Sequence, residues 1–329
     1  MTDTMRAIRI REPGDADVLE LVTVPRPEPA PGMLRVRARA SGVNRADLLQ
    51  RLGRYPAPEG YPQDIPGMEL AGVVDAVGEG VDGAWVGREV MAITGGGAYA
   101  EQVVVHEGEI VPVPDGLDLV ESAAIPEVFM TAFDAVFLQA GLREDQWLLV
   151  HAVGSGVGTA AVQLAVRAGA RVIGTSRTAD KLRAAEELGM SHGVPGDDAW
   201  PVAVLDATSG RGVDVVLDLV GAPYLAGNQR VIRKGGSHIV VGIPGGAKAE
   251  VDLGLLMRKR ATLRGTVLRS RSLDEKVALA RAFEREVLPG FQDGTLRPIV
   301  DRVFAAGDAT EAHRYMEANR NFGKILLRW

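Results

Sequence analysis

A glycine-rich turn between an apolar run and a helical pattern constrains the fold more than any other part of this sequence. The turn is His151–Gly158 (HAVGSGVG). The apolar run Trp147–Val150 precedes it, and apolar residues three to four positions apart follow it. Strand, glycine turn and helix in that order place a pyrophosphate against backbone N–H groups at a helix N-terminus. The strict G-x-G-x-x-G spacing fits neither register, because Val153 or Thr159 stands where a glycine is required. An ordinary strand-to-helix turn is therefore the alternative interpretation.

The residues at the end of the next predicted strand indicate which nucleotide would bind. An NAD site has Asp or Glu there to hold the ribose 2′-hydroxyl. This chain has Thr175, Ser176 and Arg177, with Lys181 one helical turn later. A hydroxyl and two cations suit a 2′-phosphate, which needs charge-assisted donors. We therefore predict NADPH as the cofactor, and the alternative is a solvated helix start, where Arg and Lys are common.

Composition restricts the class of protein. The 329 residues suggest two domains, and 46% hydrophobic residues are enough for a sizeable core. A net charge of −6 argues against a general nucleic-acid-binding surface. Because the sequence has no cysteine, it offers no disulfide and no thiolate zinc ligand, which suits a cytoplasmic protein. The first residues (MTDTMRAIRI) lack the apolar core of a signal peptide.

One stretch has the length of a membrane span. Trp147–Val166 contains no Asp, Glu, Lys or Arg. However, Gly154, Gly156 and Gly158 crowd its centre, and His151 lies beside them. We expect strand, loop and helix here, and no membrane partner.

The chain up to Val120 has the pattern of a β-rich domain. Short alternating or apolar runs separated by Gly and Pro predict strands at Arg6–Ile10, Leu19–Val24, Leu34–Ala40, Leu70–Val77, Glu89–Ile93, Ala98–Val105 and Ile110–Val113. One helix is expected at Arg45–Leu52, with Asn44 as its N-cap.

Beyond Val120, apolar strands alternate with helical patterns, which implies an α/β domain with a parallel, doubly wound sheet. Strands are predicted at Trp147–Val153, Ala170–Gly174, Val213–Val220, Ser237–Gly242 and Ala261–Leu268, and helices at Ala179–Leu188 and Tyr224–Arg233. After Ser270, helices are predicted at Leu273–Leu288 and Ala309–Ala318, and strands at Ile299–Phe304 and Lys324–Leu327. We expect this tail to return to the first domain, so that a cleft lies between two domains.

Six segments together resemble one known family. They are SGVNRADLLQRLGRYPAPEG (Ser41–Gly60), GMELAGVVDAVGEGV (Gly67–Val81), AAIPEVFMTAFDAVF (Ala123–Phe137), HAVGSGVGTAAVQLA (His151–Ala165), GTVLRSRS (Gly265–Ser272) and NRNFGKILL (Asn319–Leu327). With them the chain resembles the zinc-free quinone oxidoreductases of the medium-chain dehydrogenase/reductase superfamily, and most closely their p53-inducible branch. The resemblance covers nearly the whole chain.

The resemblance implies a fold, a reaction and a partner. It implies a GroES-like, partly open β-barrel catalytic domain at residues 1–124 and 270–329, and a Rossmann NADPH-binding domain at residues 125–269. The implied activity is NADPH-dependent, zinc-independent reduction of quinones by hydride transfer in the interdomain cleft. A homodimer joined through the Rossmann sheets is also implied. The run Ala261–Leu268 would otherwise be an exposed edge strand, which invites association.

The resemblance also assigns site residues by position. The pyrophosphate loop would be Ser155, Gly156, Val157 and Gly158, and the 2′-phosphate contacts Ser176 and Lys181, with Arg177 beside them. Residues near the nicotinamide would be Met130, Thr131, Gly242 and Ile243. Other implied cofactor contacts are Leu268, Arg269, Ser270 and Asn321, and the residues facing the substrate are Asn44 and Tyr55.

The sequence departs from its relatives in two places. Related members carry a Tyr near the adenosine end, whereas the segment Met190–Asp197 (MSHGVPGD) has none, which removes one expected NADPH contact. Zinc-dependent members have Cys at or beside Val43 and His at the position of Met68. Because the five histidines are scattered as well, we expect no metal site.

Quinone reduction requires few catalytic side chains, because the cofactor supplies the hydride and the protein orients the reactants. An O–H donor near the acceptor oxygen would stabilise the developing negative charge. Tyr55 is the candidate donor, although it could instead pack against Pro56 and Pro58. Asn44 is either a substrate contact or only the helix N-cap, and Ser155 is either catalytic or only a phosphate contact.

Other polar residues are expected to be structural. His151 lies in an apolar strand and suggests a satisfied core histidine. Glu69 suggests a pair with Arg45 or another cation, and Asp214 and Asp218 suggest capping carboxylates at strand ends.

Two functional alternatives stay open. The same hydride geometry permits reduction of the C=C bond of enones or 2-enoyl thioesters. The segment Met257–Ser272 has six Arg and Lys residues and no acid, so a protein that binds NADPH or RNA with little turnover is the other alternative. We expect this segment instead to cap a sheet edge and to meet cofactor phosphate or a dimer partner.

Overall fold

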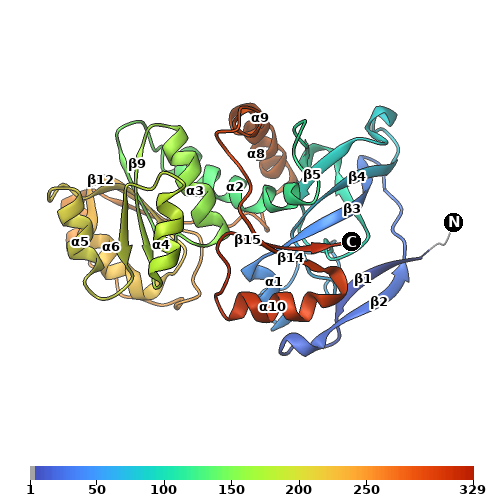
Figure 1. The fold of residues 1–329 in the computed structure, drawn as a ribbon, viewed down its shortest axis with the longest axis horizontal. Coiled ribbons are helices and arrows are strands. Elements are labelled where there is room, and N and C mark those ends of the chain that lie inside the picture. The colour runs from blue at the N-terminus through green and yellow to red at the C-terminus, as the bar shows by residue number, and fades with distance from the viewer. Residues whose placement is uncertain (1–3) are drawn as a thin grey trace. The chain divides into compact units, whose positions relative to one another are not determined.

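The structure is a computed structural model that describes residues 4–329. They form two compact units, which Figure 1 shows as a ribbon coloured along the chain. The first unit contains the chain up to Met130 together with Leu268–Trp329, and the second is the continuous segment Thr131–Val267. Helix α2 (Pro126–Phe133) contains the first boundary.

The first unit is built on two sheets: a seven-stranded sheet that is antiparallel apart from one parallel pair of strands, and a two-stranded antiparallel sheet. Its strands are β1 (Thr4–Ile10), β2 (Leu19–Pro25), β3 (Met33–Val43), β4 (Glu69–Val77), β5 (Glu89–Ile93), β6 (Gln102–His106), β7 (Ile110–Pro112), β14 (Val300–Ala305) and β15 (Lys324–Arg328). Its other helices are α1 (Arg45–Arg51), α8 (Leu273–Glu286), α9 (Leu288–Gln292) and α10 (Ala309–Glu317). The main sheet has the order β14-β15-β3-β4-β5-β7. On one edge of the long strand β3, β15 pairs with residues 40–43 and β6 pairs with residues 33–37.

Buried and exposed side chains alternate along several strands of the first unit, and the buried ones form its core. Leu34 and Val36 on β3, Leu70 on β4 and Val90 on β5 are all fully buried, and β15 adds Ile325 to the same cluster. Strand β15 pairs antiparallel with β3, with Ile325 opposite Val43. The C-terminal tail thus completes a sheet that begins near the N-terminus, and the whole has GroES-like architecture.

The second unit alternates strands and helices. Its elements in chain order are β8 (Trp147–Val150), α3 (Gly156–Arg167), β9 (Arg171–Ser176), α4 (Ala179–Glu186), β10 (His192–Pro195), α5 (Trp200–Ala207), β11 (Val213–Asp218), α6 (Leu225–Val231), β12 (Ile232–Val240), α7 (Leu253–Lys259) and β13 (Thr262–Gly265). All six strands are parallel, in the order β10-β9-β8-β11-β12-β13. Helices α3 and α4 cover one face of the sheet, and α5 and α6 cover the other (Figure 1). The predicted doubly wound, Rossmann-like sheet is therefore confirmed.

Some predicted elements differ from the observed ones. Strand β10 and helices α5 and α7 were not predicted, and the strand expected to begin at Ala98 begins only at Gln102. The helix expected to reach Arg233 ends at Val231, because β12 already begins at Ile232.

The uncharged stretch Trp147–Val166 forms strand, turn and helix, as predicted. Among residues 4–329, no helix combines the length and apolar character needed to cross a membrane.

Candidate active site

The glycine-rich turn connects β8 to the N-terminus of α3. Ser155 is the N-cap of α3, and its Oγ accepts a hydrogen bond from the backbone N–H of Gly158 at 3.1 Å. A Cβ at Gly158 would lie 2.5 Å from the carbonyl oxygen of Val153, so only glycine permits this close approach of helix to turn. The first N–H groups of α3 and its dipole make this end suitable for an anion such as a pyrophosphate.

The predicted 2′-phosphate residues lie at the carboxyl end of β9, the neighbour of β8. Ser176 is the last residue of β9, and the exposed Arg177 follows it. Lys181, on α4, lies against the glycine-rich turn. A Cβ added to Gly154 would be only 2.8 Å from Cδ of Lys181. The fold therefore brings a lysine side chain beside the turn and places Ser176 and Arg177 at the edge where parallel sheets bind ligands.

The ends of β11 and β12 lie at the same edge of the sheet. Asp218, the last residue of β11, accepts hydrogen bonds at 2.8 Å from the N–H groups of Val220 and Gly221. Gly242 follows β12, and a Cβ there would lie 3.2 Å from the carbonyl oxygen of Leu219. Ile243, the next residue, has 52% of its surface exposed. This edge of the sheet therefore carries an exposed apolar side chain.

In the first unit, a buried polar cluster lies where β3, α1, β4 and β15 meet. The Lys324 ammonium group is 2.6 Å from Glu69 Oε1 and donates at 2.7 Å to Asn44 Oδ1 and to the carbonyl oxygen of Val43. The Asn44 side-chain amide donates to Glu69 at 2.9 Å. Asn44 occupies the N-cap of α1 as predicted and forms a capping box with Asp47, and its side chain also binds Glu69 and Lys324.

The buried cation that pairs with Glu69 is thus Lys324 and not Arg45. Arg45 hydrogen-bonds Asn319 instead. The expectation that Glu69 pairs with Arg45 or another cation is confirmed, and that cation is Lys324.

Two further acids of this cluster have raised pKa values. Burial raises the pKa of Asp47 to about 6, although Asp47 accepts hydrogen bonds from Asn44 N–H, Gly67 N–H and the Tyr99 hydroxyl. Burial, and then the negative charge of Glu69, raise the pKa of Glu127 to about 8. Glu127 is only partly buried as a residue, but its Oε2 is enclosed and its backbone N–H donates to Glu69. The cluster therefore holds a proton near neutral pH.

Tyr55 lies beside the buried guanidinium group of Arg269. The Arg269 carbon Cζ lies 5.1 Å from the centre of the Tyr55 ring, and Nη1 donates to the Tyr55 carbonyl oxygen at 3.2 Å. Arg269 also donates to the carbonyl oxygen of Gly95 at 2.7 Å and to the side chain of Gln50. Burial raises the pKa of the Tyr55 hydroxyl, so this group is a neutral donor at physiological pH.

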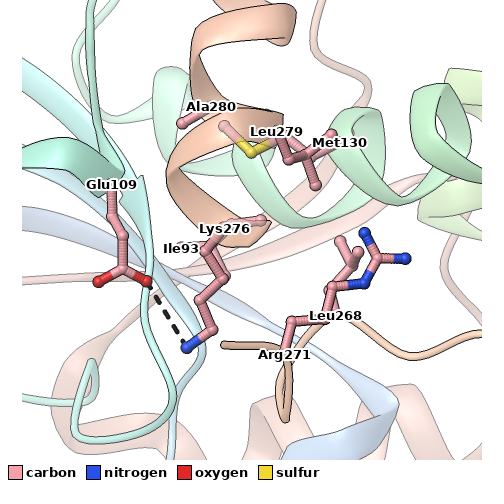
Figure 2. A pocket seen from close by; sticks show the side chains of 8 residues that line it. All are labelled: Ile93, Glu109, Met130, Leu268, Arg271, Lys276, Leu279 and Ala280. Carbon is pink, nitrogen blue, oxygen red and sulfur yellow. Dashed lines mark ion pairs between the residues drawn. The ribbon is translucent and has the colours of Figure 1, made fainter. Parts of the chain in front are cut away.

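Figure 2 shows a small pocket in the first unit. Its lining residues are Ile93, Glu109, Met130, Leu268, Arg271, Lys276, Leu279 and Ala280. Glu109 and Lys276 form the ion pair drawn in the figure, at 3.6 Å, and burial raises the pKa of Glu109. Met130 and Leu268, two residues predicted to contact the cofactor, thus line a mainly apolar pocket.

The remaining predicted cofactor residues are scattered over the two units. Thr131 is buried at the start of the second unit. Ser270 follows Arg269, and Asn321 is 9% exposed and donates to the carbonyl oxygen of Gly323 at 2.8 Å. Sequence reasoning missed Lys324 and Glu127 as members of the polar cluster. The only sequence signal for Lys324 was a lysine inside an apolar strand pattern (KILL), which requires a buried partner.

The positions at which zinc-dependent members of this superfamily bind zinc carry other residues in this chain. The sequence has no cysteine, and Met68, buried beside Glu69, stands where zinc-dependent enzymes of this fold have histidine. Within residues 4–329, no three His, Asp or Glu side chains are grouped as metal ligands. Glu69, the acid nearest to that position, is occupied by the ammonium group of Lys324.

A GroES-like unit joined to a Rossmann-like unit defines a class of nicotinamide-nucleotide-dependent oxidoreductases. Two family descriptions match the chain: the alcohol dehydrogenase GroES-like domain over residues 30–115, and the zinc-binding dehydrogenase domain over residues 156–284. A quinone oxidoreductase of Lama guanicoe is 30% identical over 330 residues, which cover 98% of this chain and 97% of the relative. The chain belongs to the medium-chain dehydrogenase/reductase superfamily.

Other relatives have different descriptions. The human synaptic vesicle membrane protein VAT-1 homolog is 32% identical over 319 residues, which cover 92% of this chain and 80% of the relative. A component of the phenolphthiocerol/phthiocerol polyketide synthase of Mycobacterium tuberculosis is 30% identical over 323 residues. This chain spans only 14% of that component's length, although the match covers 97% of this chain.

Solved structures confirm the fold over almost the whole length. An NAD-dependent alcohol dehydrogenase has a TM-score of 0.89 at 34% identity and covers 99% of this chain and 100% of its own. The mycobacterial protein Rv1454c, solved in complex with NADPH, has a TM-score of 0.87 at 28% identity, with 99% and 100% covered. The CurK enoyl reductase has a TM-score of 0.87 at 25% identity, with 99% of each chain covered.

Proposed function

We propose that this protein is an NADPH-dependent, zinc-independent quinone reductase close to the p53-inducible branch of the zinc-free quinone oxidoreductases. The cofactor assignment rests on the residues at the carboxyl end of β9. There, Ser176 and Arg177, with Lys181 on the next helix, replace the carboxylate of an NAD site. The quinone assignment is supported by a quinone oxidoreductase that matches along nearly its full length.

The residues that would hold the cofactor in this proposal belong mostly to the sheet edge. Ser155, Gly156, Val157 and Gly158 would bind the pyrophosphate through N–H groups and one hydroxyl. Gly242 and Ile243, with Met130 and Thr131, would border the nicotinamide, and Leu268, Arg269, Ser270 and Asn321 would complete the contacts. Arg269 would contribute through its backbone or through the Tyr55 loop, because its side chain already binds three groups of the first unit. When bound, NADPH supplies a hydride.

In this proposal the protein supplies orientation and one hydrogen bond. The Tyr55 O–H would donate to the acceptor oxygen on which negative charge develops. Arg269 fixes the Tyr55 backbone and lies over its ring, which limits the positions available to the hydroxyl. Asn44 would help to orient the substrate through the polar cluster, and Ser155 would act on the cofactor phosphate.

Zinc independence is part of the proposal. It is supported by the absence of cysteine, by Met68 and by the Lys324–Glu69 pair. Activity should survive exhaustive chelation, and elemental analysis should find no stoichiometric zinc. One tightly held zinc per protein chain, whose removal abolished turnover, would contradict this part.

Steady-state oxidation of NADPH tests the reaction itself. A panel of quinones should be reduced with higher kcat/KM than a panel of enones and 2-enoyl thioesters. Reduction of the C=C bond is the second candidate, and the polyketide synthase relatives and the CurK enoyl reductase structure favour it. Higher kcat/KM for the enoyl panel would replace the quinone assignment with this one.

A low-turnover RNA-binding protein is the third candidate. Among the basic residues of Met257–Ser272, Arg269 is 2% exposed and engaged inside the first unit, so it is not part of a basic surface. RNA binding with a steep salt dependence and no turnover of either panel would favour this candidate.

We also propose a homodimer and domain limits at residues 1–124 with 270–329 and at 125–269. The dimer is supported by β13, which is the last strand of its sheet and is exposed along its whole length. The apolar side chains of Leu253 and Met257 on α7 are 66% and 76% exposed near the same edge. The cytoplasmic location stays a prediction.

A further inference from the structure

A chain of hydrogen bonds joins the strand ends at which the cofactor is proposed to bind. It consists of six side chains of the second unit: Tyr224, Thr175, His151, Asn228, Asp218 and His238. We call it the strand-end network. His151, Thr175, Asn228, Asp218 and His238 are each at most 3% exposed. No step of the proposed reaction uses these residues.

The donors and acceptors of this network follow from the chemistry of its middle members. Asn228 uses its amide N–H to donate to Asp218 at 3.2 Å, so its Oδ1 faces His151 Nε2 at 2.6 Å. Because a carbonyl oxygen only accepts, His151 carries its proton on Nε2. His151 Nδ1, at 2.9 Å from Thr175 Oγ1, is then the acceptor of the Thr175 hydroxyl. Burial lowers the pKa of His151 to about 4, which agrees with a neutral ring.

The outer end of the network is the Tyr224 hydroxyl. The Tyr224 ring stacks on Trp200, with 5.3 Å between centroids, and meets the edge of His151 at 4.4 Å. Its hydroxyl donates to the carbonyl oxygen of Gly196, which follows β10, at 3.4 Å, and is also hydrogen-bonded to Thr175. The positive charge of Arg177 also acts on this hydroxyl.

The inner end of the network reaches the other strand ends. Asp218 Oδ2 lies 3.0 Å from His238 Nε2 on β12, while Asp218 Oδ1 accepts the N–H groups of Val220 and Gly221. His151 lies directly after β8, in the first position of the glycine-rich turn. Side chains at the ends of β8, β9, β11 and β12 are thus linked in one hydrogen-bonded unit.

We propose that the strand-end network is a positioning device for cofactor selection: His151 and Tyr224 hold the end of β9, so that Ser176 and Arg177 face the 2′-phosphate. This inference rests on the proposed NADPH site. It makes His151 and Tyr224 positioning residues: His151 acts through Thr175, and Tyr224 acts through Gly196, whose N–H donates to the Ser176 carbonyl oxygen at 2.8 Å. His151 itself does not touch the ligand. Because Thr175 precedes Ser176 directly, a change in its hydrogen bond moves the two specificity residues with it.

Conservative variants test the two hydrogen bonds of the His151 ring one at a time. His151→Asn retains an acceptor near the position of Nδ1 and so keeps the bond from Thr175. His151→Gln places its amide near the position of Nε2 and so keeps the bond to Asn228. His151→Leu removes both, and Tyr224→Phe removes only the outer hydroxyl. His192→Gln is the matched control, because His192 is an exposed histidine of the same sheet that stacks on Trp147 outside the network.

The dissociation constants of NADPH and NADH, measured by fluorescence titration, report on cofactor selection without turnover. We expect His151→Leu, His151→Gln and Tyr224→Phe to reduce the preference for NADPH by about threefold to tenfold. His151→Asn should retain more of the preference than His151→Gln, and His192→Gln should retain all of it. In the cofactor-free protein, amide hydrogen exchange of Ser176, Arg177 and Gly196 should accelerate in the three impaired variants.

The outcomes distinguish this inference from the proposed function. A wild-type protein that binds neither cofactor overturns both. A wild-type protein that prefers NADPH, with an unchanged preference and unchanged exchange in His151→Gln, His151→Leu and Tyr224→Phe, overturns only the positioning role. A lower melting temperature in His151→Leu with an unchanged preference also overturns it, because a purely structural histidine would give that result.

Discussion

The ammonium group of Lys324 lies 2.6 Å from the carboxylate of Glu69, and 4% and 0% of the two side chains are exposed. Lys324 also binds Asn44 and Val43, so its three hydrogens all have acceptors. A buried pair of this kind is costly to break from one side, because the remaining charge stays buried without its partner.

Replacement of Lys324 with methionine tests this pair. We expect Lys324→Met to lower the free energy of unfolding by about 3–5 kcal/mol, the usual result of leaving one charge of a buried pair. Urea denaturation measures the loss. The double variant Glu69→Gln with Lys324→Met removes both charges and should recover much of it. Equal stability of Lys324→Met and the wild type would contradict the role given to the pair.

Glu127 should make stability depend on pH. Its pKa is about 8 in the folded protein, against an ordinary value of 4.5 for a glutamate, so between these pH values the folded chain keeps a proton that the unfolded chain releases. The free energy of unfolding therefore falls as pH rises through this range. Glu127→Gln removes that dependence, and its melting temperature should exceed the wild type's more at pH 8.5 than at pH 5.5. Glu121→Gln, an exposed acid before α2, is the control. A gain that is the same at both pH values would refute the assignment.

Removal of the cations near the glycine-rich turn should change cofactor preference. The wild type is expected to prefer NADPH over NADH by at least about tenfold in kcat/KM, equivalent to roughly 1.4 kcal/mol. Arg177→Ala combined with Lys181→Ala should abolish most of that preference, because both remove positive charge near the 2′-phosphate. Arg183→Ala, an exposed cation on the same helix, should leave it intact. Equal kcat/KM for both cofactors in the wild type would disprove the NADPH assignment.

Tyr55 should affect turnover more than substrate binding. A hydroxyl that donates to the charged transition state lowers kcat when lost, by around tenfold to a hundredfold. Tyr55→Phe keeps the ring beneath Arg269, whereas Tyr55→Ala removes it. Steady-state kinetics with one quinone compares the two. If Tyr55→Phe turns over at the wild-type rate while Tyr55→Ala is impaired, Tyr55 only packs in the site.

The exposed edge of the second unit should mediate association. Sedimentation should find a species near twice 34.9 kDa at micromolar concentration. Met257→Asp combined with Leu253→Asp introduces charge beside β13 and should shift the protein toward the monomer. Val202→Asp, on α5, introduces the same charge at a site with 62% exposure and should not. A monomeric wild type would contradict the proposed dimer.

Local sequence signals predicted the second unit well. The run WLLV, the glycine turn and the apolar spacing of α3 each follow from neighbouring residues, so their order could be inferred directly. Strand β10 escaped prediction because His192–Pro195 is short and contains Gly193 and Pro195, which usually interrupt strands. It forms because it pairs with β9, and pairing is a tertiary effect.

The polar cluster of the first unit could be predicted only in part. Glu69 indicated a buried pair, but its partner is 255 positions away on another strand, and no local pattern relates the two. The N-cap position of Asn44 was predictable from the helix that follows it. The contacts of its side chain with Glu69 and Lys324 were not, because these two residues are distant from Asn44 in the sequence. The domain limits and the site assignments carried by the family resemblance stay predictions.

The pairing of β3 with β15 has a consequence for the order of events during synthesis. Val43 leaves the ribosome long before its partner Ile325, whereas every strand of the segment Thr131–Val267 has emerged by then. The inserted unit can therefore complete its sheet on the nascent chain, while β3 waits with one backbone edge unpaired. The unit that contains β3 therefore completes its sheet only after Ile325 has been translated.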